Sequence, residues 1–212
     1  MEKEFIDKLN EELLKASKQG NDEKVEYLLR LGAEVDVRGE YKQTPLMIAL
    51  DYRKNLVAKI LIENGADFRL KDNFGRNAII YAGKCKDIEL MDKFIKAGED
   101  VNVEDWLGFS PVWMAVLSRD CKMVEYLVKK GANIKMKSVA GISPLTIAMK
   151  NNDSEMIRIL IRKGCSFKLF SVEDKKAFLE ADASVRKVVL EEFKNKNKLF
   201  RLFGKKEVCC EK

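Results

Sequence analysis

Apolar residues recur along the chain in short groups with the spacing i, i+3, i+4, which places them on one face of a helix. Five such groups are Val25, Leu28 and Leu29; Ala58, Leu61 and Ile62; Met91, Phe94 and Ile95; Val124, Leu127 and Val128; and Ile157, Leu160 and Ile161. A glycine follows each group, at positions 32, 65, 98, 131 and 164. Because glycine adopts the left-handed conformation that ends a helix without steric cost, the pattern predicts five amphipathic helices, each closed by glycine.

A second helix is predicted ahead of each amphipathic one. Thr44-Pro45, Ser110-Pro111 and Ser143-Pro144 combine a capping residue with a proline suited to the first helical turn, and Asn77-Ala78 stands at the same phase. A small residue recurs farther along, and we expect it to lie within this helix and let neighbouring units approach closely. The residues concerned are Ala16, Ala49, Ala82, Ala115, Ala148 and Ala181.

All three series step by 33 residues, so the chain is built from repeated units. Each unit holds a short helix, a turn, a second helix and then about a dozen residues. In that last stretch Val101 and Val103 alternate with polar residues before a turn signal, which predicts a hairpin-like finger. The fold class is therefore all-α, a solenoid of stacked helix pairs joined by fingers.

The repeated motifs resemble those of the ankyrin repeat family. The matching stretches are Thr44-Pro45-Leu46 at a helix start, Gly65-Ala66-Asp67 at a helix end, and the turns Asp72-Asn73-Phe74-Gly75 and Asp105-Trp106-Leu107-Gly108. A histidine typical of the family is replaced, in successive units, by Met47, Ile80, Trp113 and Thr146. The three apolar replacements predict that packing holds the neighbouring loops, and Trp113 is expected to be partly buried.

The phase of the repeat divides the chain into one domain, residues 1–204, followed by a short tail at 205–212. Four full repeats are expected at 39–71, 72–104, 105–137 and 138–170. Residues 5–38 and 171–203 match the pattern incompletely, as terminal caps do, because the end units of a solenoid need a polar outer face.

The residue types present argue against an enzyme. The chain has no histidine, which removes the commonest general base and any Ser-His-Asp or Cys-His site. Five cysteines are not spaced as a zinc site, and no phosphate-binding glycine motif occurs. We expect no metal, cofactor or small-molecule substrate. An enzyme of unrecognised type remains an alternative.

The resemblance implies that a partner protein binds the finger tips and the exposed face of each first helix. Aromatic residues occupy several of these positions, where small polar residues are usual. Exposed aromatic side chains are enriched at interface hot spots, although each ring could instead pack on the next finger. The predicted binding residues are Tyr41, Tyr52, Phe74, Arg76, Trp106, Leu107, Phe109 and Ile142, with Phe74, Trp106 and Phe109 as central contacts.

The predicted function is that of a non-catalytic protein–protein interaction module, acting as an adaptor, an inhibitor or a targeting protein. Net charge is +6, from 40 basic and 34 acidic residues that are interspersed, which does not by itself point to nucleic acid. The basic segment 194–206 has two interpretations, a helix that binds a membrane surface or nucleic acid, or the last helix of the cap. We expect a monomer in the cytoplasm, since no secretory signal is visible and an odd cysteine count suits reduced thiols; export to a host cell without a classical signal stays open.

Overall fold

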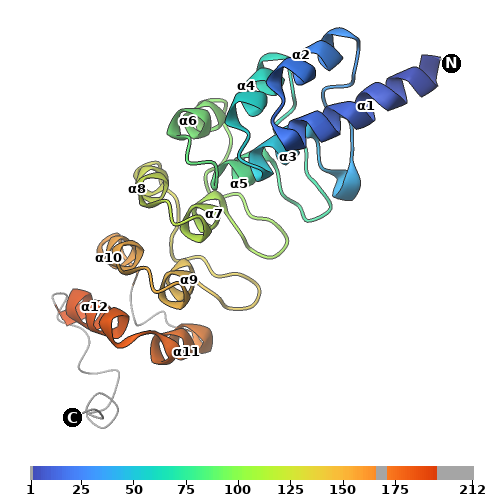
Figure 1. Ribbon diagram of the computed structural model, residues 1–212. Coiled ribbons are helices and arrows are strands. Elements are labelled where there is room, and N and C mark those ends of the chain that lie inside the picture. The colour runs from blue at the N-terminus through green and yellow to red at the C-terminus, as the bar shows by residue number, and fades with distance from the viewer. Residues whose placement is uncertain (1, 166–170, 195–212) are drawn as a thin grey trace.

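The structure is a computed structural model that describes residues 2–165 and 171–194. Within these ranges twelve α-helices stack as antiparallel pairs into a curved solenoid, and no strand occurs (Figure 1). The odd-numbered helices are α1 (Glu2–Gln19), α3 (Pro45–Asp51), α5 (Ala78–Ala82), α7 (Pro111–Leu117), α9 (Pro144–Lys150) and α11 (Val172–Glu180). The even-numbered helices are α2 (Asp22–Arg30), α4 (Asn55–Glu63), α6 (Ile88–Lys96), α8 (Cys121–Lys129), α10 (Ser154–Arg162) and α12 (Ala183–Lys194).

The odd-numbered helices form one layer of the stack and the even-numbered helices the other. Each odd-numbered helix contacts the odd-numbered helix of the next unit, from α1 through α11. The predicted all-α solenoid of helix pairs is therefore confirmed.

The glycines that close the even-numbered helices behave as predicted. Gly32, Gly65, Gly98 and Gly131 have φ between 85° and 96°, and Gly164 has φ of 125°. After each glycine the chain turns back, as where the N–H of Ala33 donates to the carbonyl of Leu28. The left-handed residue therefore satisfies carbonyls that the helix end would leave unpaired.

The predicted capping of the odd-numbered helices is correct at two of the four starts. The hydroxyl of Thr44 accepts the N–H of Met47, and that of Ser143 accepts the N–H of Thr146. The prediction is wrong for Asn77 and Ser110, whose side chains make no capping bond. The amide of Asn77 instead donates to Glu99 on the next finger, at 2.8 Å.

The alanine series fills the core between units. Its first five members are at most 1% exposed, inside odd-numbered helices. Ala181 is also buried but lies just past the end of α11, so its predicted place within a helix is wrong. The reason is a change of phase, because α11 begins 28 residues after α9 (172 − 144) rather than 33.

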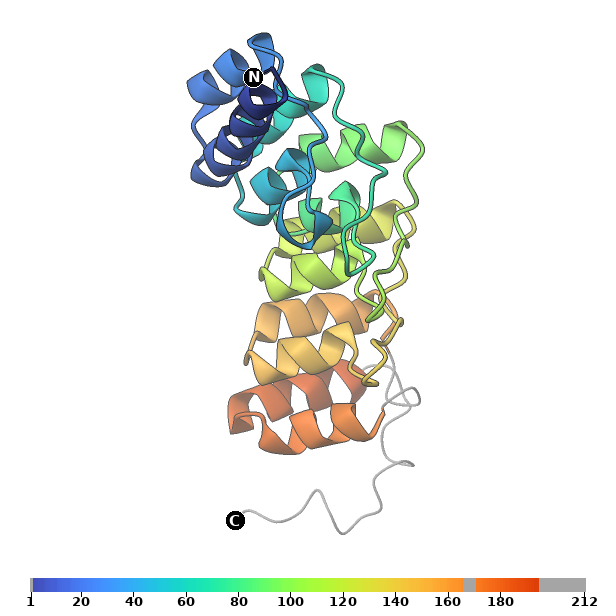
Figure 2. The same cartoon turned by 90° about the vertical axis from the view of Figure 1, so that its right-hand side faces the viewer.

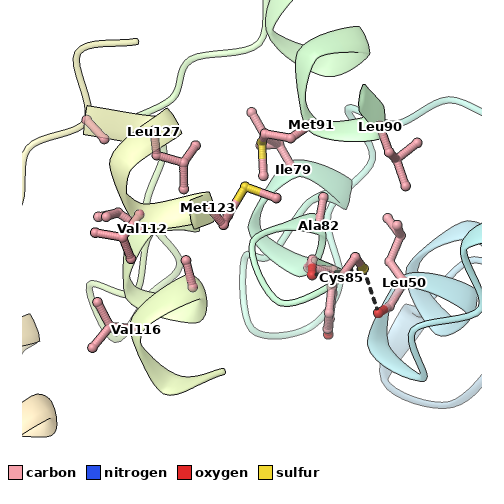
Figure 3. Close-up of a cluster of buried hydrophobic side chains, with 14 of the residues drawn as sticks. Leu50, Ile79, Ala82, Cys85, Leu90, Met91, Val112, Val116, Met123 and Leu127 are labelled. Carbon is pink, nitrogen blue, oxygen red and sulfur yellow. Dashed lines mark hydrogen bonds between the residues drawn. The ribbon is translucent and has the colours of Figure 1, made fainter. Parts of the chain in front are cut away.

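Sulfur-containing side chains pack with aliphatic ones in the middle of the stack. Met91 and Met123 lie between the third and fourth units, and Cys85 points toward Leu50, to whose carbonyl its thiol donates at 3.2 Å (Figure 3). The third unit also approaches the fourth closely, since a Cβ at Gly83 would lie 2.2 Å from the carbonyl oxygen of Pro111. Only glycine fits between α5 and α7 at this point.

The two ends of the solenoid differ from the inner units. Helix α1 has 18 residues, whereas α3, α7 and α9 have seven, and it begins at Glu2, ahead of the expected cap start at residue 5. Glu2 and Glu4 in its first turn interact favourably with the helix dipole. At the other end, Asp174 of α11 is buried and accepts hydrogen bonds from the hydroxyls of Ser143 and Thr146.

Candidate functional site

The fingers end in tight turns of one repeated geometry. In four fingers of the described part of the chain, a backbone N–H donates to the carbonyl four residues later, from Gly39 to Gln43, from Asp72 to Arg76, from Asp105 to Phe109 and from Ser138 to Ile142. The side chains of Asp72 and Asp105 accept further backbone N–H bonds inside their own turns. The fingers are thus hairpin-like in path, although their tips are turns rather than paired strands in the part of the chain described.

Backbone hydrogen bonds also tie each finger tip to the next. The N–H of Asn73 donates to the carbonyl of Tyr41, that of Trp106 to Phe74, and that of Val139 to Leu107, at 2.8 to 3.0 Å. These bonds hold successive tips side by side along one edge of the stack (Figure 2). The side chains at the tips therefore form a single row.

That row is apolar and exposed. Tyr41 is 52% exposed, Phe74 39%, Trp106 70%, Leu107 47% and Val139 79%. The rings of Tyr41 and Phe74 pack at a centroid distance of 5.6 Å, so part of each is covered by its neighbour. We refer to these five residues as the finger-tip ridge.

A family model for ankyrin repeats matches three overlapping stretches of the chain, residues 13–105, 54–138 and 112–181. Together these stretches cover well over half of the chain.

The chain belongs to the ankyrin repeat family.

Two related ankyrin repeat proteins match about a third of the chain each. Ankyrin repeat protein R664 of Acanthamoeba polyphaga mimivirus is 35% identical over 74 residues, which are 35% of this chain and 46% of the relative. An ankyrin repeat-containing protein of Treponema pallidum (strain Nichols) is 34% identical over 70 residues, 33% of this chain and 24% of the relative. The chain thus spans less than half the length of either relative.

Four of the predicted binding residues, Tyr41, Phe74, Trp106 and Leu107, lie in the finger-tip ridge of this ankyrin domain. Val139 occupies the same register as Trp106, 33 residues on, and extends the ridge into the next repeat. Repeat position alone identifies it.

The predicted residues Arg76, Phe109 and Ile142 lie at the base of the fingers and are half-buried. Phe109 packs on Trp113 with ring centroids 4.7 Å apart, and Trp113 is fully buried rather than partly buried as expected. Phe109 thus supports the core as well as the finger.

Arg76 is held in place by an ion pair across two fingers. Its Nε lies 2.8 Å from the buried carboxylate of Asp105, and its guanidinium covers the ring of Phe74 at 5.3 Å. Burial acts to lower the pKa of Arg76, but Asp105 and Tyr81 outweigh it, so the pKa is raised and the side chain stays charged. Arg76 therefore supports the finger-tip ridge by linking two adjacent fingers beneath the ring of Phe74.

A buried tyrosine joins this arrangement. The hydroxyl of Tyr81 donates to Asp72 at 2.6 Å and accepts a hydrogen bond from the amide of Gln43 at 2.8 Å. Burial, followed by the hydrogen bond to Asp72, raises the pKa of Tyr81, which keeps the hydroxyl protonated. Sequence reasoning missed this network because its members come from two repeats and share no motif.

Tyr52 lies away from the ridge, at the far end of α3. It is 47% exposed, and the ammonium group of Lys18 lies 5.0 Å from its ring centroid. It belongs to the opposite edge of the concave face.

The residues that replace the family's histidine hold their loops in different ways. Ile80 and Trp113 are fully buried, as expected for packing. Met47 is also buried, and its sulfur accepts the N–H of Thr44 at 3.5 Å. Thr146 instead uses its hydroxyl, which bonds the N–H of Ser143 at 3.0 Å and the carboxylate of Asp174. The histidine is thus replaced by packing alone at Ile80 and Trp113, by packing with a hydrogen bond to sulfur at Met47, and by hydrogen bonding at Thr146.

Two of the thiols, those of Cys85 and Cys121, lie in surroundings that disfavour the reactive thiolate. Burial raises the pKa of Cys85 to about 12 and that of Cys121 to about 11. Within residues 2–165 and 171–194, no group of three potential metal ligands comes together. No helix in these ranges is long and apolar enough to cross a membrane. The predicted alternative interface at 194–206 lies outside the described residues except for Lys194.

Proposed function

We propose that this protein is a non-catalytic module that binds a partner protein along its finger-tip ridge. The observation that carries the proposal is the exposure of five large apolar side chains in one aligned row. Contiguous exposed apolar surface of this kind is typical of interaction sites, and tryptophan and tyrosine are the residues most enriched among hot spots. Ankyrin repeats generally mediate binding to other proteins.

The ridge is preorganised for binding. The tips are joined by backbone hydrogen bonds, and Arg76 and Asp105 fix the fingers from within. A rigid surface loses little conformational entropy on association, so more of the contact free energy is available for affinity. We infer Trp106 as the central contact, with Tyr41, Phe74, Leu107 and Val139 around it, and Arg76, Phe109 and Ile142 as supports.

The cellular setting that fits the thiols is a reducing one. Cys85 and Cys121 are free thiols. We propose a cytoplasmic location, in the cell of origin or in a host.

The proposal is tested by affinity capture with two matched variants. The ridge variant is Trp106→Ala with Leu107→Ala, and the outer-helix variant is Tyr27→Ala with Leu56→Ala, whose residues are 60% and 59% exposed on α2 and α4. A protein from the native organism should bind immobilised wild type and the outer-helix variant, but not the ridge variant. Equal capture by all three proteins, with equal melting temperatures, would refute the proposal.

A further inference from the structure

The turns between the two helices of five successive units share a backbone conformation suited to glycine, and three of these turns hold a cationic residue there. Positions 20, 53, 86, 119 and 152 follow the 33-residue period, and all have positive φ, between 51° and 80°. Gly20 takes this conformation freely and Asn152 tolerates it. The other three are Arg53, Lys86 and Arg119, side chains for which the left-handed conformation is strained. We refer to these three residues as the basic row.

Three adjacent repeats therefore carry strain together with a positive charge. Glycine would relieve the strain at each position, as it does at Gly20. Strained residues that persist in a structure are concentrated at functional sites. Backbone strain and positive charge thus recur together at one repeat position, which indicates that the positive charge is the property kept at the cost of strain.

The positive charge of the basic row is left open to solvent. Arg53, Lys86 and Arg119 are all exposed, and none makes an ion pair with another residue of the described ranges. Arg53 donates to the hydroxyl of Ser118 at 3.3 Å, and Arg119 to the carbonyl of Asn151 at 2.9 Å, so both guanidinium groups extend along the stack. The row runs from repeat to repeat as a line of cations.

Nearby carboxylates are already engaged elsewhere. Asp51 pairs with Lys84. Asp87, Asp120 and Asp153 cap the even-numbered helices by accepting the N–H groups of Leu90, Met123 and Met156. These acids are held by hydrogen bonds to helix N-termini, and none of them forms an ion pair with the basic row.

The spacing of the row matches an extended chain. Packed helices lie about 8–10 Å apart, so the backbone positions of the basic row are separated by about that distance, and the guanidinium of Arg53 reaches farther, to Ser118 two repeats on. A segment in the extended polyproline II conformation rises about 3.1 Å per residue with three residues per turn, so side chains at i, i+3 and i+6 lie on one face, about 9 Å apart. We propose that the basic row binds an extended acidic segment of the partner protein, with carboxylates at positions i, i+3 and i+6.

This inference rests on the proposed function, because it states which chemical groups of the same partner would bind a second surface, the basic row, in addition to the finger-tip ridge. The ridge precedes each odd-numbered helix, and the basic row follows it. Helices α3, α7 and α9 have seven residues, or about 10 Å at 1.5 Å per residue, so one partner on the concave face reaches both. The ridge would bind its apolar residues and the row its carboxylates.

A protein segment suits the row better than single-stranded nucleic acid does. Proteins that bind single strands place aromatic side chains between their basic ones, so that bases can stack. Tyr52 is the aromatic side chain beside Arg53, and Lys18 already covers its ring. Oligonucleotide binding therefore serves as the rival outcome in the test.

The test is fluorescence anisotropy of the full-length protein with labelled peptides. One peptide carries glutamate at every third position among serines, and a second has the same composition with its glutamates contiguous. The row variant is Arg53→Gly, Lys86→Gly and Arg119→Gly. The charge-matched control is Lys122→Gln, Lys129→Gln and Lys163→Gln, whose residues are exposed on or after α8 and α10.

We expect the spaced peptide to bind wild type more tightly than the contiguous peptide, with an affinity that falls as salt rises. The row variant should bind the spaced peptide at least about tenfold more weakly. It should also melt at a temperature at least about 2 °C higher, because strain is relieved. Asn152→Gly and the charge-matched control should keep wild-type binding.

Two results would overturn the inference. One is equal binding of the spaced peptide by the row variant and the charge-matched control. The other is tighter binding of an oligothymidylate strand than of the spaced peptide. The ridge variant should bind the peptide like wild type, so failure of the ridge proposal and failure of the row proposal give different results.

Discussion

The indole ring of Trp106 lies over Gly75 of the preceding finger. A Cβ atom at Gly75 would be 2.6 Å from both Cδ1 and Nε1 of that ring, and the backbone N–H of Trp106 donates to the carbonyl of Phe74 at 3.0 Å. The orientation of the most prominent ridge side chain is thus set by the finger before it. The contact between Gly75 and Trp106 therefore belongs both to the packing of the fingers and to the proposed interface.

Substituting Gly75→Ala should displace the Trp106 ring as well as strain the turn. Gly75 has φ of 77°, which costs an alanine about 1–2 kcal/mol. Gly98→Ala is the matched control, because its φ is 89° but no atom lies within 4 Å of the added Cβ. Both variants should lose similar stability in urea, and only Gly75→Ala should lose partner capture. Equal capture by the two variants would show that the Trp106 position is unimportant.

Removing the hydroxyl of Tyr81 should destabilise the third repeat. Tyr81→Phe leaves one oxygen of the buried Asp72 carboxylate without its donor, at a cost of about 1–3 kcal/mol. Tyr126→Phe should cost less than about 1 kcal/mol, because Asp92 there is less buried and keeps Lys96 and Lys130. Chemical denaturation compares the two variants, and equal losses would mean that burial of the Tyr81–Asp72 pair has no special role.

The carboxylate of Asp174 should secure the C-terminal cap. Asp174→Ala removes the acceptor for the buried hydroxyls of Ser143 and Thr146 and breaks the capping box with Ser171, so we expect a loss of about 1–3 kcal/mol. Amide hydrogen exchange should speed up first in α11 and α12. Glu180→Ala on the exposed end of α11 is the control, and similar exchange in both variants would contradict this role.

Glu192 should make the stability of α12 depend on pH. It accepts hydrogen bonds from Arg162 at 2.8 Å and Arg158 at 3.0 Å, and these lower its pKa from the ordinary 4.5, Arg162 foremost. A carboxyl with a lowered folded pKa contributes stability that is present above its unfolded pKa and is lost as pH falls below it. Wild type should therefore exceed Glu192→Gln in urea midpoint at pH 7, and the difference should shrink below about pH 4.5. A constant difference from pH 7 to pH 3 would contradict this linkage.

The sequence was sufficient to predict the repeat and most helix positions, because the signals are local. Gly65 ends α4 for the same backbone reason as Gly98 ends α6, and Thr44 caps α3 through a residue three positions away. Residues at the tip of a turn are exposed to solvent. It was therefore possible to predict that Tyr41, Phe74, Trp106 and Leu107 lie at the surface. In a repeat protein, residues one period apart in the sequence occupy equivalent positions in adjacent repeats.

Contacts between repeats could not be predicted in the same way. Tyr81 meets Gln43 across 38 residues of sequence, and Asp174 meets Thr146 across 28, and neither pair forms a motif. The phase change at α11 likewise depends on packing against α9. The period of Arg53, Lys86 and Arg119 is visible in the sequence, but its meaning depends on the left-handed conformation that only the structure shows.

The most direct measurement is the dissociation constant of the captured partner for wild type, the ridge variant and the outer-helix variant, obtained by isothermal titration calorimetry. Loss of Trp106 and Leu107 should weaken binding at least about tenfold, as expected for a hot spot, whereas loss of Tyr27 and Leu56 should leave it unchanged. Melting temperatures of the three proteins should agree, since all four side chains are exposed. A ridge variant that binds as tightly as wild type would contradict the assignment of the finger tips as the interface.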